Sequence, residues 1–70
     1  MTAYEYWQHP QTLEVWAVKL TDGKVAGATQ IGQQDVHQDL LPHFAYRSDD
    51  VDELNRDRDV FRKVDGRKVA

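Results

Sequence analysis

The chain has 70 residues and a formal net charge of −3, and its composition is 40% hydrophobic and 30% charged. This length suffices for one small domain, and the composition is that of a folded globular protein rather than a disordered one. The sequence contains no cysteine, which excludes disulfides, iron–sulfur clusters and cysteine-based zinc sites and is typical of a reducing compartment.

The hydrophobic residues are too scattered to predict membrane association. The longest uninterrupted apolar run covers residues 15–18, far short of the roughly 20 residues that a membrane-spanning helix needs. Residues 1–5 have neither the basic start nor the apolar run of a signal peptide. We therefore expect a cytoplasmic protein that does not bind membranes.

Residues 4–31 predict a three-stranded antiparallel meander. The run at 13–20 is rich in β-branched and aromatic residues, and Asp22-Gly23 separates it from a second apolar run at 25–31. Asp-Gly between two such runs indicates a hairpin, because both central residues of a type I′ turn need a positive φ. Residues 4–7 add a short strand, joined to the hairpin through a turn at Pro10.

The two-residue turn also predicts a register and a buried face. It pairs Leu20 with Val25, Val18 with Gly27, and Trp16 with Thr29. The face that we expect to form the core then collects Trp16, Val18, Leu20, Val25 and Ile31. The opposite face shows Leu13, Val15, Ala17, Lys19, Ala26, Ala28 and Gln30. Gly27 would leave a gap beside Val18 in which the indole of Trp16 can lie flat.

Residues 32–48 predict an irregular segment that contains at most a short helix. Asp35 is suited to begin such a helix, but Pro42 limits it to two turns because proline lacks an N–H group. The aromatic pair Phe44 and Tyr46 should then pack on the edge of the core.

Residues 49–64 predict a helix, followed by a basic tail at 65–70. Asp50 as N-cap and Glu53 three residues later resemble a capping box, and Gly66 is suited to close the helix. The apolar side chains that share one helical face are Val51, Leu54, Phe61 and Val64. Asp57 falls on this apolar face, and residues 64–67 are also compatible with a second hairpin turn.

Together these segments predict a single α+β domain over residues 1–70. A three-stranded antiparallel meander carries a C-terminal helix, which packs across the face of Trp16, Val18 and Leu20.

The sequence lacks the residue patterns of catalytic, metal-binding and nucleotide-binding sites. His9, His37 and His43 do not have metal-ligand spacing, and no nucleotide-binding glycine motif is present. The acidic residues around Asp52 do not follow a calcium loop, because glycine is missing at the sharp turn. Ser48 is the only serine. We therefore expect no catalytic residue, no metal site and no cofactor, and we do not expect an enzyme.

Aromatic and charged side chains suggest binding instead. In a strand, Tyr4 and Tyr6 point to one face and Trp7 to the other, which gives more aromatic surface than one helix can bury. The candidate binding residues are Tyr4, Tyr6, Trp7, Arg56, Arg62 and Lys63. The leading hypothesis is a small non-catalytic interaction or regulatory module that binds a protein partner or a second copy of itself.

Two alternatives stay open at this point. A nucleic-acid-associated module would use the sheet aromatics together with the basic C-terminus, where Arg67 and Lys68 lie. The negative net charge argues against nucleic acid as a partner. The other alternative is a small acidic inhibitor that occupies a basic groove on a larger protein.

Overall fold

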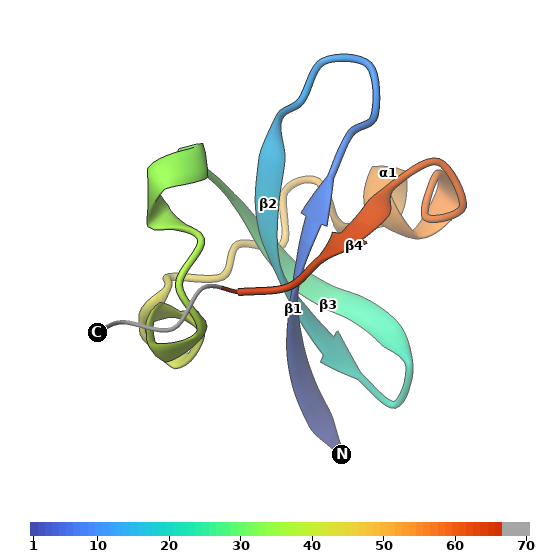
Figure 1. Cartoon of the computed structure of the whole chain (residues 1–70). Helices are drawn as coiled ribbons and strands as arrows, with labels where there is room; N and C mark the ends of the chain where they lie inside the picture. The colour runs from blue at the N-terminus through green and yellow to red at the C-terminus, as the bar shows by residue number, and fades with distance from the viewer. Residues whose placement is uncertain (67–70) are drawn as a thin grey trace.

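A computed structural model describes residues 1–66 of the chain, and these form a four-stranded antiparallel sheet in the order β3-β2-β1-β4 (Figure 1). The strands are β1 (Thr2–Gln8), β2 (Val15–Thr21), β3 (Lys24–Ile31) and β4 (Arg62–Val64). The helices are the 3₁₀ helices η1 (Gln33–Asp35) and η2 (Gln38–His43) and the α-helix α1 (Val51–Arg56). The predicted α+β class and the three-stranded meander are confirmed, and a fourth strand is added to them.

The β2–β3 hairpin closes as the sequence predicts. Asp22 and Gly23 have φ values of 51° and 83°, the left-handed conformation that a type I′ turn requires at both central residues. Leu20 pairs with Val25 next to this turn.

Farther from the turn the predicted register is wrong by one residue. A bulge leaves Ala26 unpaired, so that Val18 pairs with Ala28 and Trp16 with Gln30. A shift of one residue reverses the face of every following side chain. Ile31 therefore lies on the face opposite to the predicted one, and Ala28 and Gln30 lie on the face of Trp16.

The need for a glycine at position 27 comes from Tyr46 and not from the indole of Trp16. A Cβ atom on Gly27 would lie 2.9 Å from the Cβ atom of Tyr46, closer than two carbon atoms can pack. The backbone of Arg47 then pairs with Ala28, with N···O distances of 2.7 and 3.0 Å. The glycine thus lets the segment before α1 run against the outer edge of β3.

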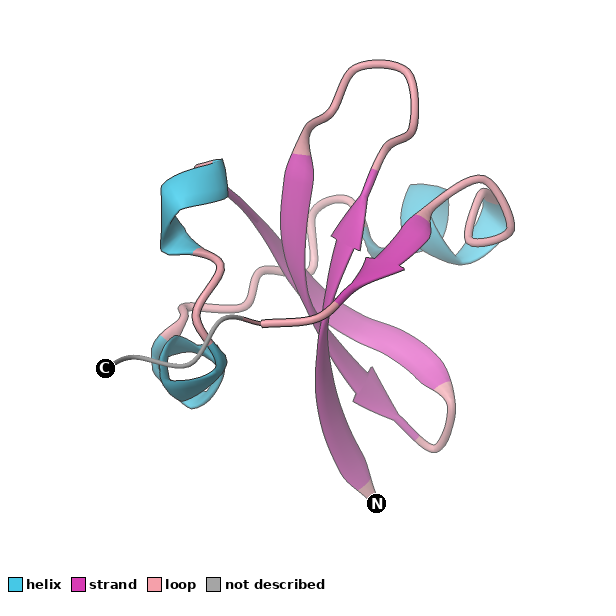
Figure 2. Ribbon diagram, in the orientation of Figure 1, coloured by secondary structure: helices cyan, strands magenta, loops and turns pink. Residues whose placement is uncertain are grey.

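The sheet carries a small core on each face. The first contains Trp7, Val18, Leu20, Val25, Ala28 and Leu54, with Trp16, Val51 and Phe61 packed against it. The second contains Tyr6, Val15, Ala17 and Val36, with Ile31, Leu41, Phe44, Tyr46 and Val64 packed against it. α1 lies on one side of the sheet and the two 3₁₀ helices on the other (Figure 2). The predicted packing of the C-terminal helix is confirmed, but the single predicted core is wrong, and Phe44 and Tyr46 pack on the face opposite to the predicted core.

The C-terminal helix is much shorter than the predicted range of 49–64. It ends at Arg56, and Asp57 is its C-cap residue. A longer helix would turn the Asp57 carboxylate toward the apolar face, where an unpaired charge is costly. Instead the chain turns over residues 57–60 and returns as β4, which pairs Val64 with Tyr6. Phe61 reaches Trp7, with ring centroids 5.9 Å apart.

The predicted capping box at the start of this helix is also wrong. Asp50 occupies the N-cap position, but its side chain makes no capping hydrogen bond within the described part of the chain. The predicted basic tail at 65–70 is described only as far as Gly66, so Arg67 and Lys68 lie outside the described residues.

Two side chains fasten α1 and its following turn to the β2–β3 hairpin. The Oδ1 atom of Asn55 accepts a hydrogen bond from the N–H of Val25 (3.0 Å), and its Nδ2 atom donates to the carbonyl of Val25 (3.2 Å). Arg58 donates to the carbonyl of Gly23 (2.8 Å), and its guanidinium lies 5.6 Å from the ring centroid of Trp7. The side-chain amide of Asn55 therefore pairs with the backbone of Val25 in the way that a neighbouring strand would.

We predict that Asn55→Ala lowers the free energy of unfolding by about 1–3 kcal/mol, because it leaves both backbone groups of Val25 unpaired in a partly buried place. Urea denaturation with a tryptophan fluorescence readout measures this. Arg56→Ala, one residue along the same helix and exposed, is the matched control, with an expected change within about 0.5 kcal/mol. Equal losses in the two variants would contradict the role given to Asn55.

Candidate functional site

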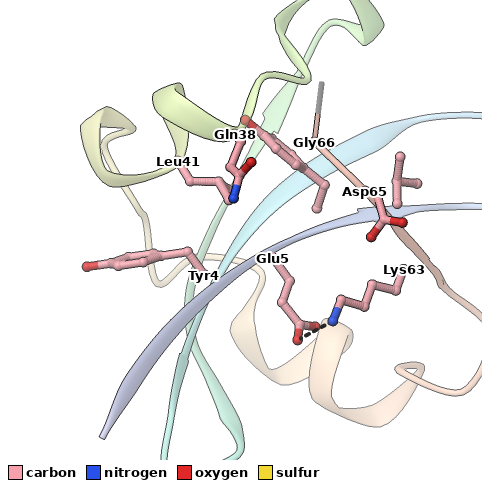
Figure 3. Close-up of a pocket in the computed structure, with 9 residues that line it drawn as sticks. Tyr4, Glu5, Gln38, Leu41, Lys63, Asp65 and Gly66 are labelled. Atoms are coloured by element: carbon pink, nitrogen blue, oxygen red, sulfur yellow. Dashed lines mark ion pairs between the residues drawn. The ribbon is translucent and has the colours of Figure 1, made fainter. Parts of the chain in front are cut away.

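A groove opens where β4 ends beside β1. It has a volume of about 280 Å³ and is lined by Tyr4, Glu5, Tyr6, Gln38, Leu41, Lys63, Val64, Asp65 and Gly66 (Figure 3). β1 forms its floor, the end of β4 one wall, and η2 the other. The groove exists because β4 pairs only with residues 6–8 of β1, while β1 continues to Thr2.

An ion pair fixes the wall of the groove that faces α1. The Nζ atom of Lys63 lies 3.4 Å from an Oε2 atom of Glu5, and the other carboxylate oxygen of Glu5 accepts a hydrogen bond from the indole N–H of Trp7 (3.0 Å). Glu5 and Lys63 come from adjacent strands and point to the same face. The negative charge of Glu5 is thereby neutralised within the chain.

Tyrosine side chains lie where the floor of the groove meets η2, and Tyr4 and Tyr6 line it. The rings of Tyr4 and Tyr46 stack in a tilted arrangement with centroids 5.3 Å apart, and Tyr4 is 38% exposed. The hydroxyl of Tyr46 donates to the carbonyl of Leu41 in η2. The buried hydroxyl of Tyr6 accepts a hydrogen bond from the N–H of His37 (3.2 Å) and donates to its carbonyl.

Burial raises the pKa of two of these phenols above the ordinary tyrosine value. Desolvation raises the pKa of Tyr46 to about 12, with smaller contributions from Tyr6 and Tyr4. Desolvation also raises the pKa of Tyr6, against a lowering by its hydrogen bond to the backbone of His37. At neutral pH both groups are therefore neutral hydrogen-bonding groups that hold η2 against the sheet.

The hydrogen bonds of β1 alternate between its two sides, and this alternation identifies the groups that point into open space. The carbonyl of Met1 accepts from the N–H of Asp22 (3.1 Å), and the N–H of His9 donates to the carbonyl of Glu14 (2.9 Å). In an antiparallel ladder every second residue bonds to the same neighbour, so the odd-numbered residues of β1 bond to β2. The N–H and C=O groups of Thr2 and Tyr4 consequently point away from β2, beyond the end of β4.

The outer edges of β3 and β4 are protected in part, since among residues 1–66 nothing pairs with the outward backbone groups of Gln30. On β3, the outward groups of Val25 pair with Asn55 and those of Ala28 pair with Arg47. β4 is only three residues long and exposes the charged side chains of Arg62 and Lys63, which discourage the addition of another strand. Among residues 1–66, none pairs with the outward groups of Thr2 and Tyr4.

The structure separates the residues that the sequence proposed for binding. Tyr4, Tyr6 and Lys63 meet at the groove. Tyr6 and Trp7 are only 1% and 5% exposed, so the expected exposed aromatic surface is reduced to Tyr4. Arg56 lies on α1 beside Asp57, at a distance of 3.4 Å, and Arg62 is exposed opposite Gln8.

Six residues that line the groove were not expected from the sequence: Glu5, Gln38, Leu41, Val64, Asp65 and Gly66. Thr2, beside the groove, was not expected either. Its contribution comes from the backbone, so its side chain carries no signal of its own. To predict Thr2, one would have to extend the strand predicted at residues 4–7 toward the N-terminus. One would also have to know which edge of that strand has no neighbour.

A second hollow lies on the other side of the molecule, with a volume of about 260 Å³. It lies between the half-buried ring of Trp16 and the segment before α1, where Arg47 lies 3.6 Å from Asp49. Both of these charged side chains are 72% exposed, so the ion pair is a weak surface contact.

Within residues 1–66, no three His, Asp or Glu side chains gather in a way that could hold a metal ion. In the same range, no helix has the length and apolar character needed to cross a membrane.

The chain matches no protein-family model, and neither curated proteins nor solved structures show a match to it.

We predict that the free energy of unfolding falls as the pH rises from 10 to 12. Folded Tyr46 holds its proton up to about pH 12, whereas the unfolded side chain loses it near its ordinary pKa of 10.0. The stabilisation is thus complete below pH 10 and is lost as the pH passes through the folded pKa.

Tyr46→Phe isolates this effect, because lysine titration is common to both chains. We expect the variant to lose about 1 kcal/mol at pH 8 with the hydrogen bond to Leu41, and to show a shallower decline above pH 10. Urea denaturation at several pH values measures both quantities, and parallel declines in the two proteins would contradict the assignment to Tyr46.

Proposed function

We propose that this protein is a non-catalytic interaction module that binds an extended protein segment by adding it as a strand to the N-terminal half of β1. The observation that carries the proposal is the outward direction of the N–H and C=O groups of Thr2 and Tyr4 on an edge that no residue of 1–66 covers. Strand addition uses such groups for affinity and nearby pockets for selectivity.

The groove beside this edge supports the same function. An added strand that runs along Thr2 and Tyr4 meets the groove at Glu5, where β4 has ended. Leu41 and Val64 offer apolar surface there, and the Glu5–Lys63 ion pair offers polar surface on the opposite wall. A side chain of the added segment therefore has a place to dock next to the paired backbone.

The contrast between the sheet edges is a further argument. Natural proteins cover or charge the edges that are not used for pairing, as this chain does with Asn55 and Arg47 on β3 and with Arg62 and Lys63 on β4. The segment Thr2–Tyr4 contains no charge and no proline. Its open edge is thus the place on the sheet where an extended segment pairs with least hindrance.

The alternative functions receive less support from the geometry. Base stacking by the sheet aromatics would need Tyr6 and Trp7 at the surface, and both are buried. For the inhibitor alternative, six of the twelve acidic residues lie within residues 49–59, and none of these six lines the groove. A cytoplasmic location continues to rest on the cysteine-free sequence.

We predict that Thr2→Pro weakens the binding of an edge-pairing peptide about tenfold. Proline removes the outward N–H of residue 2, and the β1–β2 ladder is kept because that N–H does not point to β2. Peptides selected from a random phage-displayed library on the full chain serve as the probe. Isothermal titration measures the affinity, and amide shifts of Thr2 and Tyr4 in nuclear magnetic resonance spectra locate the binding.

Thr2→Val is the matched control, because it keeps the N–H and a β-branched side chain, and we expect it to bind like the wild type. The proposal is wrong if the selection yields no peptide that shifts these amides. It is also wrong if Thr2→Pro binds the selected peptides with unchanged affinity.

A further inference from the structure

We infer that the extended segment that this edge accepts is β1 of a second copy of the chain, paired antiparallel through residues 2–4 around a two-fold axis at Ala3. This inference rests on the proposed function, because it names the partner of the same edge. The two sheets would then join into one continuous sheet through their β1 strands.

The outward backbone groups are self-complementary in this arrangement. They belong to residues 2 and 4, which are symmetric about residue 3. In an antiparallel pair centred on Ala3, Thr2 of each copy lies opposite Tyr4 of the other, and each such pair exchanges both N–H···O bonds. Every outward N–H and C=O group of Thr2 and Tyr4 in both copies is then satisfied.

The side chains suit the same register. The two Ala3 residues lie directly opposite each other at a position without mutual hydrogen bonds, where the strands approach most closely, about 4.5 Å between Cα atoms. A small side chain fits there. Thr2 lies opposite the aromatic ring of Tyr4 from the other copy, and pairs of aromatic and β-branched residues are favourable across strands.

The charge distribution allows a second copy of the chain to pair at this edge. Each copy carries a net charge of −3, which opposes association in general. Residues 2–4 are uncharged, and Glu5, the first charged residue along the strand, is neutralised by Lys63. The edge is therefore a place where two identical chains meet without direct repulsion.

Two of the four large hydrophobic side chains that are exposed lie at this edge. They are Met1 and Tyr4, whereas Leu13 and Val60 lie elsewhere. Tyr4 belongs to the segment that would pair and Met1 precedes it, so the second copy would cover part of both side chains. The N-terminal half of β1 also extends past the end of β4 (Figure 1), and no strand within residues 1–66 lies along its outer side there.

The size of the contact sets the expected strength. A few residue pairs bury less than the roughly 1,200 Å² of total surface found in standard stable interfaces. The dimer should therefore be weak and in rapid exchange, with a dissociation constant on the order of 100 μM. Sedimentation velocity and amide shifts between about 10 μM and 1 mM cover this range.

The experiment places like charges at the proposed two-fold axis. Ala3→Lys and Ala3→Glu each put two equal charges directly opposite each other, and we expect each variant alone to dimerise at least tenfold more weakly than the wild type. An equimolar mixture of the two variants pairs opposite charges and should recover a dimer at least as strong as that of the wild type. The side chain of Ala3 is exposed, and its N–H stays bonded to β2, so both variants should fold.

Ala45→Lys and Ala45→Glu are matched controls, because Ala45 is exposed in the segment that follows η2 and the changes in net charge are identical. We expect both controls to dimerise nearly as the wild type does. Circular dichroism checks that all variants are folded.

Each outcome decides the inference. A wild-type chain that stays monomeric at 1 mM while selected peptides still bind the Thr2–Tyr4 edge overturns self-pairing and leaves the proposed function standing. Peptides that bind without sensitivity to Thr2→Pro overturn the proposed function itself. A dimer that forms equally well with either charge at residue 3, or that is not recovered in the mixture, uses another surface and also overturns the inference.

Discussion

The arrangement of the molecule depends on the one-residue bulge at Ala26 in β3. Before the bulge, Val25 faces α1 opposite Leu20. After it, Ile31 faces the 3₁₀ helices, and Ala28 joins the core under α1. The bulge therefore distributes the apolar side chains of one short strand between two cores, so that a thin sheet in a 70-residue chain is covered on both faces.

The bulge also determines how the outer edge of β3 is closed. Its extra residue separates two of the outward-facing positions of β3, Val25 and Ala28, and a different segment reaches each of them. The side-chain amide of Asn55 pairs with the first, and the backbone of Arg47 pairs with the second. Arg47 precedes α1 and Asn55 lies within it. The packing of this helix on the sheet therefore also brings the groups that pair with the edge of β3 into place.

The opposite side of the sheet is closed only in part. β4 satisfies the outward groups of β1 near Tyr6 and Gln8 and then leaves the sheet at Asp65. Along the remaining length of β1, no residue of 1–66 pairs with the outward backbone groups, and an exposed tyrosine and the groove lie beside them. The hydroxyls of Tyr6 and Tyr46 hold η2 in place, so the proposed strand addition uses the backbone of this edge rather than those side chains.

The sequence by itself determined the features that depend on short-range geometry. Asp22-Gly23 imposes its turn because few other residue pairs adopt two positive φ angles. Side chains alternate between the two faces of a strand, so Tyr6 and Trp7 point to opposite faces of the sheet. The sequence also indicated Tyr4 and Lys63 as binding candidates, and both line the groove.

Tertiary structure decided the bulge at Ala26, the early end of α1 and the conversion of residues 62–64 into β4. Each of these depends on partners far away in the sequence: Tyr46 against Gly27, Asn55 on Val25, and Tyr6 beside Val64. The openness of the edge at Thr2 is likewise invisible in the sequence, because backbone groups are the same at every residue and only the paths of neighbouring strands decide which of them are paired.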